Sequence, residues 1–381
     1  MTYLCLAVAI AWLVFTLATT LNLLATPRLP GAADLNIGEG RPSVSVVIAA
    51  RDEAARIEQT VQGLLAQQSI ELELIVVDDR STDATQDILA RAAARDPRLS
   101  VLRVDELPEC WLGKCHACWL GAKRARGEWL LFTDGDIHMR DDLVARAIAV
   151  AQRDAADHVT LWPGVNSKGI LARASILAWG QCLAVYCPAA RINRDRGRKG
   201  IGIGAFNLVR SEAYRAIGGH EPLRLEVVDD IKLGLLLRRA GFRQRLYAGF
   251  NDLEAEWAQS SLAVIRAVEK NWFARLDFSV VKSAACLTIL SAMWLVGLAG
   301  PLLDGYAGWA ALAGFLSPIV PALIQTRLTG WPWYVAIPAP LGFAMFILAG
   351  VHSTAKTLLQ GGIRWRETFY PLAMLRSGLV K

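Results

Sequence analysis

Trp129-Leu-Leu-Phe-Thr133 reads as a buried β-strand, and it runs directly into Asp134-Gly-Asp136. Apolar, β-branched stretches of the same kind precede it, separated by amphipathic stretches of helical period. We expect these strands at Val44–Ala50, Leu72–Val77 and Ser100–Val104, and the helices at Glu53–Gln68, Asp83–Arg95 and Lys114–Arg126. Strands that alternate with helices in this order predict right-handed crossovers, and therefore an α/β fold with a mostly parallel sheet and helices on both faces.

Acidic side chains follow three of the predicted strands at the points where they end: Arg51-Asp52-Glu53, Asp78-Asp79 and Asp134-Gly-Asp136. Ligands of parallel sheets bind at the carboxyl ends of the strands, so these side chains should meet at one edge. Stabilisation of a helix N-terminus accounts for Asp83, but not for two carboxylates that bracket a glycine. Neighbouring carboxylates repel one another unless a cation joins them, which favours Mg²⁺ or Mn²⁺ carrying a diphosphate.

Charge is distributed unevenly over the 381 residues. Asp, Glu, Lys and Arg are absent before Arg28 and from residues 283–303, 305–326 and 328–355, each long enough to cross about 30 Å of hydrocarbon. No basic residue precedes the first apolar stretch, which favours an uncleaved anchor over a signal peptide. We therefore predict transmembrane helices at both ends. The expected parts are a transmembrane anchor over 1–27, a cytosolic catalytic domain over 28–280, a membrane region of two to three segments over 281–355 and a basic tail over 356–381.

The side of the membrane on which the tail lies is left open by these segments. Three crossings after a cytosolic domain would place it outside, whereas its Lys and Arg residues favour the inside. Prolines at 332, 338 and 340 allow 328–355 to be re-entrant or interfacial, which leaves two crossings and a cytosolic tail. Residues 170–187 are apolar but interrupted by Arg173, and they fit an interfacial helix as well as a core helix.

Composition excludes some classes of protein. The net charge of +6 comes without a stripe of Lys and Arg interleaved with aromatic residues, so nucleic acid is not an expected partner. Seven cysteines without framework spacing predict no disulfides in a reducing cytosol. Cys110, Cys115, His116 and Cys118 cluster, but no second Cys-x-x-Cys pair completes a zinc site of usual spacing.

Five stretches in order give the chain a family resemblance over about residues 43–280: Val46–Glu53, Val76–Asp83, Trp111–Lys114, Thr133–Asp136 and Val228–Asp230. With them the chain resembles inverting family 2 glycosyltransferases of the GT-A fold. It looks most like their membrane-bound branch of ceramide glucosyltransferases and hopanoid-associated enzymes. The resemblance implies transfer of a sugar from a nucleotide sugar, expected to be a UDP-sugar, onto a hydroxyl of a lipid in the inner membrane.

The resemblance also assigns roles to residues of the nucleotide-sugar site. Glu53, Asp78 and Asp79 would hold the base and ribose of the donor, with Arg51 beside them. Lys114 would face the donor phosphates. Asp134 and Asp136 would form the Asp-x-Asp element, in which Asp136 binds the metal and Asp134 helps to position metal or sugar. The alternatives are a turn formed by Asp79 with Ser81 and a solvated lysine at position 114.

An inverting transfer needs one general base at the acceptor and no protein nucleophile. By the resemblance this base is Asp230, with Asp229 as its partner; two helix caps are the alternative. Residues 200–206 would be a loop on the acceptor side, where glycines let a substrate approach the backbone. Relatives with lipid acceptors carry Gln-x-x-Arg-Trp; this chain has Glu269-Lys-Asn-Trp272 instead, and Trp272 is the candidate to close over the donor.

Two other functions remain possible from the sequence. A non-catalytic, nucleotide-binding membrane subunit would have the same fold, although it would be expected to have lost the metal pair or the base. Transfer of sugar to polyprenyl phosphate would use an acceptor that is already ionised and needs no strong base. Intact Asp134, Asp136 and Asp230 favour a metal-dependent hexosyltransferase with a hydroxyl acceptor.

Overall fold

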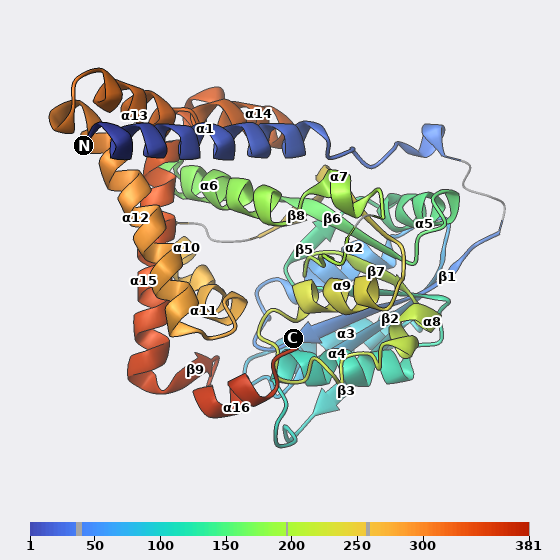
Figure 1. The fold of residues 1–381 in the computed structure, drawn as a ribbon. Coiled ribbons are helices and arrows are strands. Elements are labelled where there is room, and N and C mark those ends of the chain that lie inside the picture. The colour runs from blue at the N-terminus through green and yellow to red at the C-terminus, as the bar shows by residue number, and fades with distance from the viewer. Residues whose placement is uncertain (36–39, 196, 257–259, 381) are drawn as a thin grey trace. The chain divides into compact units, whose positions relative to one another are not determined.

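The computed structural model describes residues 1–35, 40–195, 197–256 and 260–380. This described chain divides into two compact units, and the chain passes between them repeatedly. Unit 1 consists of Met1–Ala25, Asn166–Ala189 and Trp257–Arg376; unit 2 consists of Thr26–Val165, Ala190–Glu256 and Ser377–Lys381. Unit 2 holds the sheet, and unit 1 holds the long apolar helices (Figure 1).

Unit 2 is built on a mixed sheet in which eight strands of the described residues follow the order β3-β2-β1-β4-β7-β6-β8-β5. The strands are β1 (Ser43–Ala50), β2 (Glu71–Asp79), β3 (Leu99–Val104), β4 (Trp129–Thr133), β5 (Ile137–Met139), β6 (His158–Val165), β7 (Asn207–Arg210) and β8 (Gln244–Ala255). Strands β3, β2, β1 and β4 pair in parallel, as predicted, and so do β6 and β8. β7 runs antiparallel to β4 and β6, and β5 runs antiparallel to β8.

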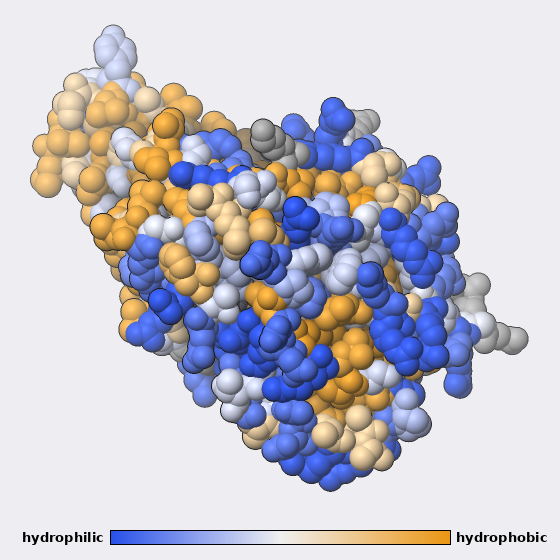
Figure 2. Space-filling model, turned by 90° about the horizontal axis from the view of Figure 1, so that it is seen from below, coloured by the Kyte–Doolittle hydropathy of each residue, from blue (hydrophilic) through white to orange (hydrophobic). Residues whose placement is uncertain are grey.

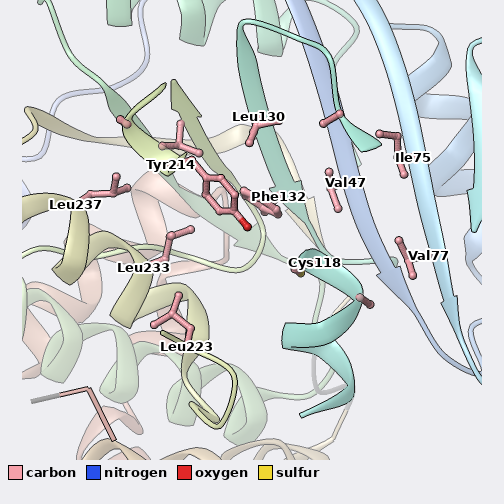
Figure 3. Close-up of a cluster of buried hydrophobic side chains, with 14 of the residues drawn as sticks. Val47, Ile75, Val77, Cys118, Leu130, Phe132, Tyr214, Leu223, Leu233 and Leu237 are labelled. Carbon is pink, nitrogen blue, oxygen red and sulfur yellow. The ribbon is translucent and has the colours of Figure 1, made fainter. Parts of the chain in front are cut away.

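Helices cover both faces of this sheet because its central strands are apolar on both sides. They are α2 (Ile57–Leu65), α3 (Thr85–Arg95), α4 (Gly113–Arg124), α5 (Leu143–Arg153), α8 (Ser211–Ala216) and α9 (Asp229–Arg239). On one face Val47, Val77 and Phe132 pack with residues of α4, α8 and α9 in one buried cluster (Figure 3). Ile48 and Leu131 point to the other face and are also fully buried.

The predicted helices begin later than expected where side chains bind their first amides. The helix expected from Glu53 starts at Ile57, because Glu53 N donates to Thr85 Oγ1 at 2.8 Å and Ala54 N donates to Asp83 Oδ2 at 3.0 Å. Asp83 likewise accepts from Thr85 N, the first residue of α3. These bonds tie together the loops that follow β1 and β2.

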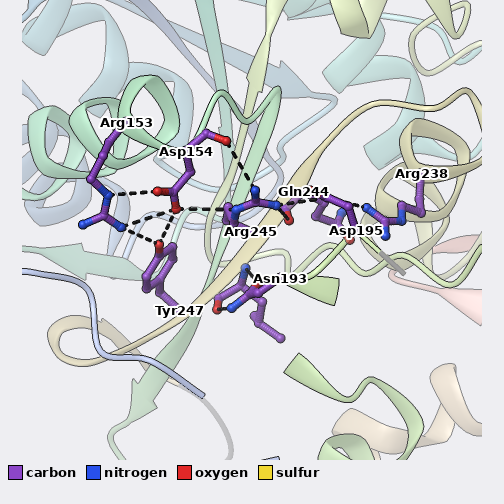
Figure 4. A network of polar contacts seen from close by, with 9 residues as sticks. Arg153, Asp154, Asn193, Asp195, Arg238, Gln244, Arg245 and Tyr247 are labelled. Atoms are coloured by element: carbon purple, nitrogen blue, oxygen red, sulfur yellow. Dashed lines mark hydrogen bonds and ion pairs between the residues drawn. The ribbon is translucent and has the colours of Figure 1, made fainter. Parts of the chain in front are cut away.

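A polar network fixes the chain that enters the second half of unit 2 (Figure 4). After the short helix α7 (Ala189–Ile192), Asn193 exchanges two hydrogen bonds with the backbone of Leu246 in β8. Asp195 accepts from Arg238 of α9 at 2.8 Å and from Arg245 of β8 at 3.0 Å. The C-terminal half of α9 is therefore held to β8 through this segment.

Unit 1 is helical except for a small hairpin. Its helices are α1 (Thr2–Leu24), α6 (Ile170–Tyr186), α10 (Ser261–Glu269), α11 (Asn271–Arg275), α12 (Val280–Leu303), α13 (Tyr306–Leu316), α14 (Ile319–Thr329), α15 (Ala339–Gln360) and α16 (Leu372–Ser377). The hairpin pairs β9 (Gly362–Trp365) with β10 (Thr368–Pro371). The short 3₁₀ helices η1 (Ala32–Asp34) and η2 (Trp333–Ala336) lie in unit 2 and unit 1, respectively.

Small residues and aromatic rings join these helices. Gly308 of α13 lies so close to Gly300 of α12 that an added Cβ would meet the Gly300 oxygen at 1.9 Å. Trp12 of α1 packs edge-on against Phe315 and Phe343. Close approach at small residues is typical of helices packed in a membrane. Many outward-facing side chains of α12 and α13 are apolar, among them Ile289, Leu295 and Trp309, and Figure 2 shows hydrophobic side chains gathered at one end of the face that it draws.

Five helical stretches of the described chain are long and apolar enough to cross a membrane: Thr2–Leu24, Ile170–Ile192, Val280–Leu303, Tyr306–Thr329 and Ala339–Gln360. The stretch from Ile170 was expected to be an interfacial or a core helix, and by length and composition it also qualifies as a span. The expected segment 305–326 is two helices, because Pro318 has no N–H to continue the first one.

Candidate active site

The turn Asp134-Gly-Asp136 directly follows β4, and side chains of unit 2 fix its shape. Thr60 of α2 donates a hydrogen bond of 2.9 Å to the carbonyl of Gly135. Thr133 donates one of 2.8 Å to the carbonyl of Ala205. The turn is thus held from two sides, and its carboxylates project from a rigid strand end.

Lys114 joins this turn to the start of α9. Its Nζ donates to Asp134 Oδ1 at 2.7 Å and lies 3.9 Å from Asp229 Oδ1. Burial alone would lower the pKa of Lys114, but the carboxylates of Asp134, Asp229 and Asp230 raise it well above its ordinary value. Lys114 is therefore protonated at neutral pH and offsets part of the negative charge of the site.

Gly204 lies between the predicted metal-binding turn at Asp134 and the predicted base, Asp230. Its amide donates to Asp230 Oδ2 at 2.8 Å, and an added Cβ would lie 2.7 Å from Asp134 Oδ2. The interpretation of Gly200 and Gly202 as places of substrate approach was wrong. A Cβ on Gly200 would meet the Gly234 oxygen at 2.2 Å, so these glycines admit the backbone of α9 instead.

A buried polar cluster holds the loop 200–206 in this position. His158 contacts Asn207 Oδ1 through Nε2 at 3.1 Å and Gln244 Nε2 through Nδ1 at 2.5 Å. Gln244 exchanges hydrogen bonds with the backbone of Ile201, and Asn207 Oδ1 accepts from Ile203 N. Burial lowers the pKa of His158 to about 4, so its ring is neutral.

Asp136 carries charge that its protein neighbours do not fully compensate. Burial and the charges of Asp134 and Glu53 raise the pKa of Asp136 to about 7, although Arg56 and Lys114 oppose them. The Asp136 carbonyl accepts from Glu256 N at 3.2 Å, so a further carboxylate residue lies next to it. Oxygen donors of this density are the ligands that a hard divalent cation prefers.

Asp78 and Asp79 have different surroundings at the end of β2. Asp78 is fully buried and accepts from Arg103 at 2.5 Å and from Ser81 N at 3.1 Å. Asp79 pairs with Arg80 at 2.8 Å and lies 3.9 Å from Arg51. A Cβ on Gly113 would lie 2.1 Å from Asp79 Oδ2, so the glycine lets α4 begin against this carboxylate.

Trp272 lies in unit 1, apart from the unit that holds the predicted carboxylates. Its ring packs edge-on against Phe346 and donates through Nε1 to Ser283 Oγ at 3.4 Å. A Cβ on Gly350 would come within 2.7 Å of the ring. These contacts bury the indole within the helices of α11, α12 and α15.

A cavity in unit 2 brings together residues that sequence reasoning found and residues that it missed. His220 faces Asp229 at 3.9 Å through Nε2, while its Nδ1 contacts the Tyr214 hydroxyl at 2.8 Å. No local motif marks His220, which reaches the site only through tertiary packing, and the sequence placed Cys118 in a cysteine cluster without assigning it to this site. The cavity is lined by Lys114, Cys118, Phe132, Thr133, Asp134, Gly204, Asn207, His220, Asp229, Asp230 and Leu233.

The α/β sheet has the GT-A type of fold, with an Asp-x-Asp turn at the end of one strand and an acidic helix start facing this turn. The family model described as Glycosyl transferase family 2 matches residues 45–218. This match covers the first part of the sheet and the turn Asp134-Gly-Asp136. The five apolar stretches, long enough to cross a membrane, come in addition to this fold.

Particular relatives cover most of the chain. The 4,4'-diaponeurosporenoate glycosyltransferase of Staphylococcus aureus (strain USA300) is 24% identical over 343 residues, 87% of this chain and 89% of the relative. Its namesake in Staphylococcus haemolyticus (strain JCSC1435) is 22% identical over 269 residues, 68% of each chain. A solved structure of mannosyltransferase PcManGT from Pyrobaculum calidifontis, in complex with GDP-Man and Mn²⁺, has a TM-score of 0.54 at 19% identity. It covers 93% of this chain and 99% of its own, and the likeness shows the fold.

Proposed function

We propose that this chain is an inverting, metal-dependent hexosyltransferase that moves a sugar from a nucleoside-diphosphate sugar to a hydroxyl of an apolar lipid. The observation that carries the proposal is the cavity in which Lys114, Asp134, Asp229 and Asp230 converge at the carboxyl ends of the strands. The family match, and the GDP-Man and Mn²⁺ of the similar mannosyltransferase, support the donor and the metal. Membrane association follows from the apolar helices, and a cytosolic site at the inner membrane is part of the proposal.

A divalent cation fits the residues around Asp136. Burial raises the pKa of this carboxyl, and the negative charges of Asp134 and Glu53 raise it further, so a bound cation would offset both effects. Asp136 would hold Mg²⁺ or Mn²⁺, with Asp134 at its side, and the bound ion would neutralise the diphosphate and make it a better leaving group. Arg51, Glu53, Asp78 and Asp79 would bind the nucleoside, and Lys114 would face the phosphates.

Asp230 is the proposed general base. One carboxylate oxygen is fixed by Gly204 N at 2.8 Å and the other by the helix amide of Ile231 at 2.8 Å. Both bonds hold the carboxylate in one orientation, and a carboxylate held in this way can accept a proton from an attacking hydroxyl. Asp229 is directed instead towards Lys114 and His220, which favours a supporting role.

The acceptor class follows from the membrane helices and from the relatives. Those relatives are named for 4,4'-diaponeurosporenoate, a carotenoid-derived lipid, and not for ceramide or hopanoids. We therefore propose a long, apolar lipid as the acceptor and place carotenoid-type lipids first among the candidates. Trp272 stays the candidate to close over the donor.

The test uses detergent-purified protein with a panel of nucleotide sugars, Mg²⁺ or Mn²⁺, and an apolar lipid extract that includes polyprenyl phosphate. Mass spectrometry should detect a metal-dependent glycolipid that is lost in Asp136→Asn and Asp230→Asn. Asp87→Asn, an exposed acid on α3, is the matched control and should keep full activity. Donor binding without any transfer would identify a non-catalytic subunit, and transfer to polyprenyl phosphate that survives Asp230→Asn would identify the alternative acceptor.

A further inference from the structure

The end of the chain, residues Ser377–Val380, folds as part of unit 2, although the chain up to Arg376 belongs to unit 1. From here on, the name tail is used for these four residues alone. It lies against the buried segment Leu225–Val228, which leads directly into Asp229 at the start of α9. Gly378 approaches this segment so closely that an added Cβ would lie 2.5 Å from the Cβ of Leu225. The tail therefore packs by its backbone, at a position where a side chain does not fit.

Two charged side chains hold the backbone of Val380. Glu226 accepts a hydrogen bond from Val380 N, and Lys232 Nζ donates one of 2.6 Å to Val380 O. Glu226 and Lys232 also form an ion pair of 3.6 Å, and they are 1% and 9% exposed. Buried charges are costly unless hydrogen-bonded, so the amide and carbonyl of the tail stabilise this pair.

These contacts lie on both sides of the proposed base. Glu226 comes three residues before Asp229, and Lys232 comes two residues after Asp230. The Val380 side chain adds to the hydrophobic cluster that holds α9 on the sheet through Leu233 and Leu237 (Figure 3). The tail is hydrogen-bonded to residues before and after Asp229 and Asp230, so it constrains the first turn of α9.

We propose that the tail is a positioning element for Asp230. By fixing the first turn of α9, it keeps Asp230 against the amide of Gly204 and keeps Asp229 facing Lys114. The inference rests on the proposed function, in which Asp230 accepts the proton of the acceptor. A displacement of about 1 Å in a reacting group lowers the rate on the order of 10²-fold, so a small loosening of α9 is sufficient.

The test compares Gly378→Ala with Gly63→Ala, because a Cβ on Gly63 meets nothing within 4 Å. Gly378→Ala should lower kcat at least about tenfold while the donor KM stays within about twofold. Hydrogen exchange should become faster in residues 223–236 and stay unchanged in β4. Lys232→Met should reproduce both effects, and Lys232→Arg, which keeps a charged donor, should restore most of the rate. Gly63→Ala should behave as the parent protein.

The inference is overturned if Gly378→Ala leaves exchange of residues 223–236 unchanged, or speeds exchange there without lowering kcat. A general loss of Tm and of protection across the whole sheet would overturn it too, because the tail would then serve stability alone. Exchange is measured without substrate. An inactive parent protein would therefore count against the proposed function, while the exchange data would still decide whether the tail orders α9.

Discussion

Gly204 sets how closely the carboxylates of Asp134 and Asp230 can lie. An added Cβ would be 2.7 Å from Asp134 Oδ2 and 3.4 Å from Asp230 Oδ2, so at least the first carboxylate would have to move. We expect Gly204→Ala to lower kcat on the order of 10²-fold with little change in Tm. Initial rates with saturating donor test this, with Gly63→Ala as the control. A rate near that of the parent protein would show that the spacing of these carboxylates is unimportant.

Lys114 offsets the charge of the acidic groups around it. Lys114→Met removes this positive charge, so the pKa of the neighbouring carboxyls should rise. Because the proposed base must be ionised, the acidic limb of the profile of kcat/KM against pH should move to higher pH, by about one unit. Lys114→Arg keeps the charge and should leave the limb where it is. An unmoved limb in Lys114→Met would refute this electrostatic role.

The sequence predicted the residues of the site that stand at strand ends or at a helix start. Asp134 follows an apolar strand and Asp230 begins an amphipathic helix, and such positions can be recognised from local pattern. His220 could not be predicted, because it lies in a turn and reaches Asp229 only through packing against Phe132 and Tyr214. The position of His220 depends on tertiary contacts, which the local pattern of apolar and polar residues does not predict.

At the scale of elements, the position of the loop 200–206 depends on the hydrogen bonds of the buried cluster around His158. The pKa of this imidazole falls through burial from 6.5 to about 4, while the unfolded chain keeps the ordinary value. Between these pH values the unfolded state binds a proton that the folded state does not, so stability is lost as pH falls through this window. The loss is at most about 1.4 kcal/mol per pH unit.

The Tm of the detergent-solubilised protein should therefore fall between pH 6.5 and pH 4. His158→Gln cannot bind the proton, so its Tm should be lower at neutral pH but should decline less steeply over the same range. Differential scanning fluorimetry of both proteins measures the two slopes. Parallel slopes would mean that other groups cause the loss.

Strands were predicted more closely than helix starts or the second half of the sheet. β4 was expected at Trp129–Thr133 and lies there, because its apolar run is bounded by Glu128 on one side and Asp134 on the other. α2 starts four residues later than predicted at Glu53, because Thr85 and Asp83 bind the amides that a helix would otherwise leave open. The antiparallel strand β7 follows a glycine-rich loop, and its pairing with β4 is a long-range contact without a local signal.

At the scale of the whole molecule, the sequence predicted apolar helices at both ends but not the return of the chain to unit 2. Ser377 folds with that unit, so it should lie on the same side of the membrane as Cys110, an exposed thiol there. In sealed vesicles of either orientation, a membrane-impermeant maleimide should label Ser377→Cys, in a Cys110→Ser background, whenever it labels Cys110 in the parent protein. Opposite labelling would contradict the fold of the tail.

The tail also constrains how often the chain crosses the bilayer. A folded unit lies on one side, so the chain that leaves unit 2 after Glu256 and rejoins it at Ser377 must cross an even number of times. The described stretch between them holds candidate spans in α12, in α13 with α14, and in α15; an even number means that at least one of them enters the membrane without traversing it. By the same parity we expect that α6, which leaves unit 2 and returns to it as a single helix, does not cross, and basic residues stand at both of its ends, Lys168 and Arg191. We then expect α1 to be the unpaired crossing, with Met1 and the candidate site of unit 2 on opposite sides of the membrane.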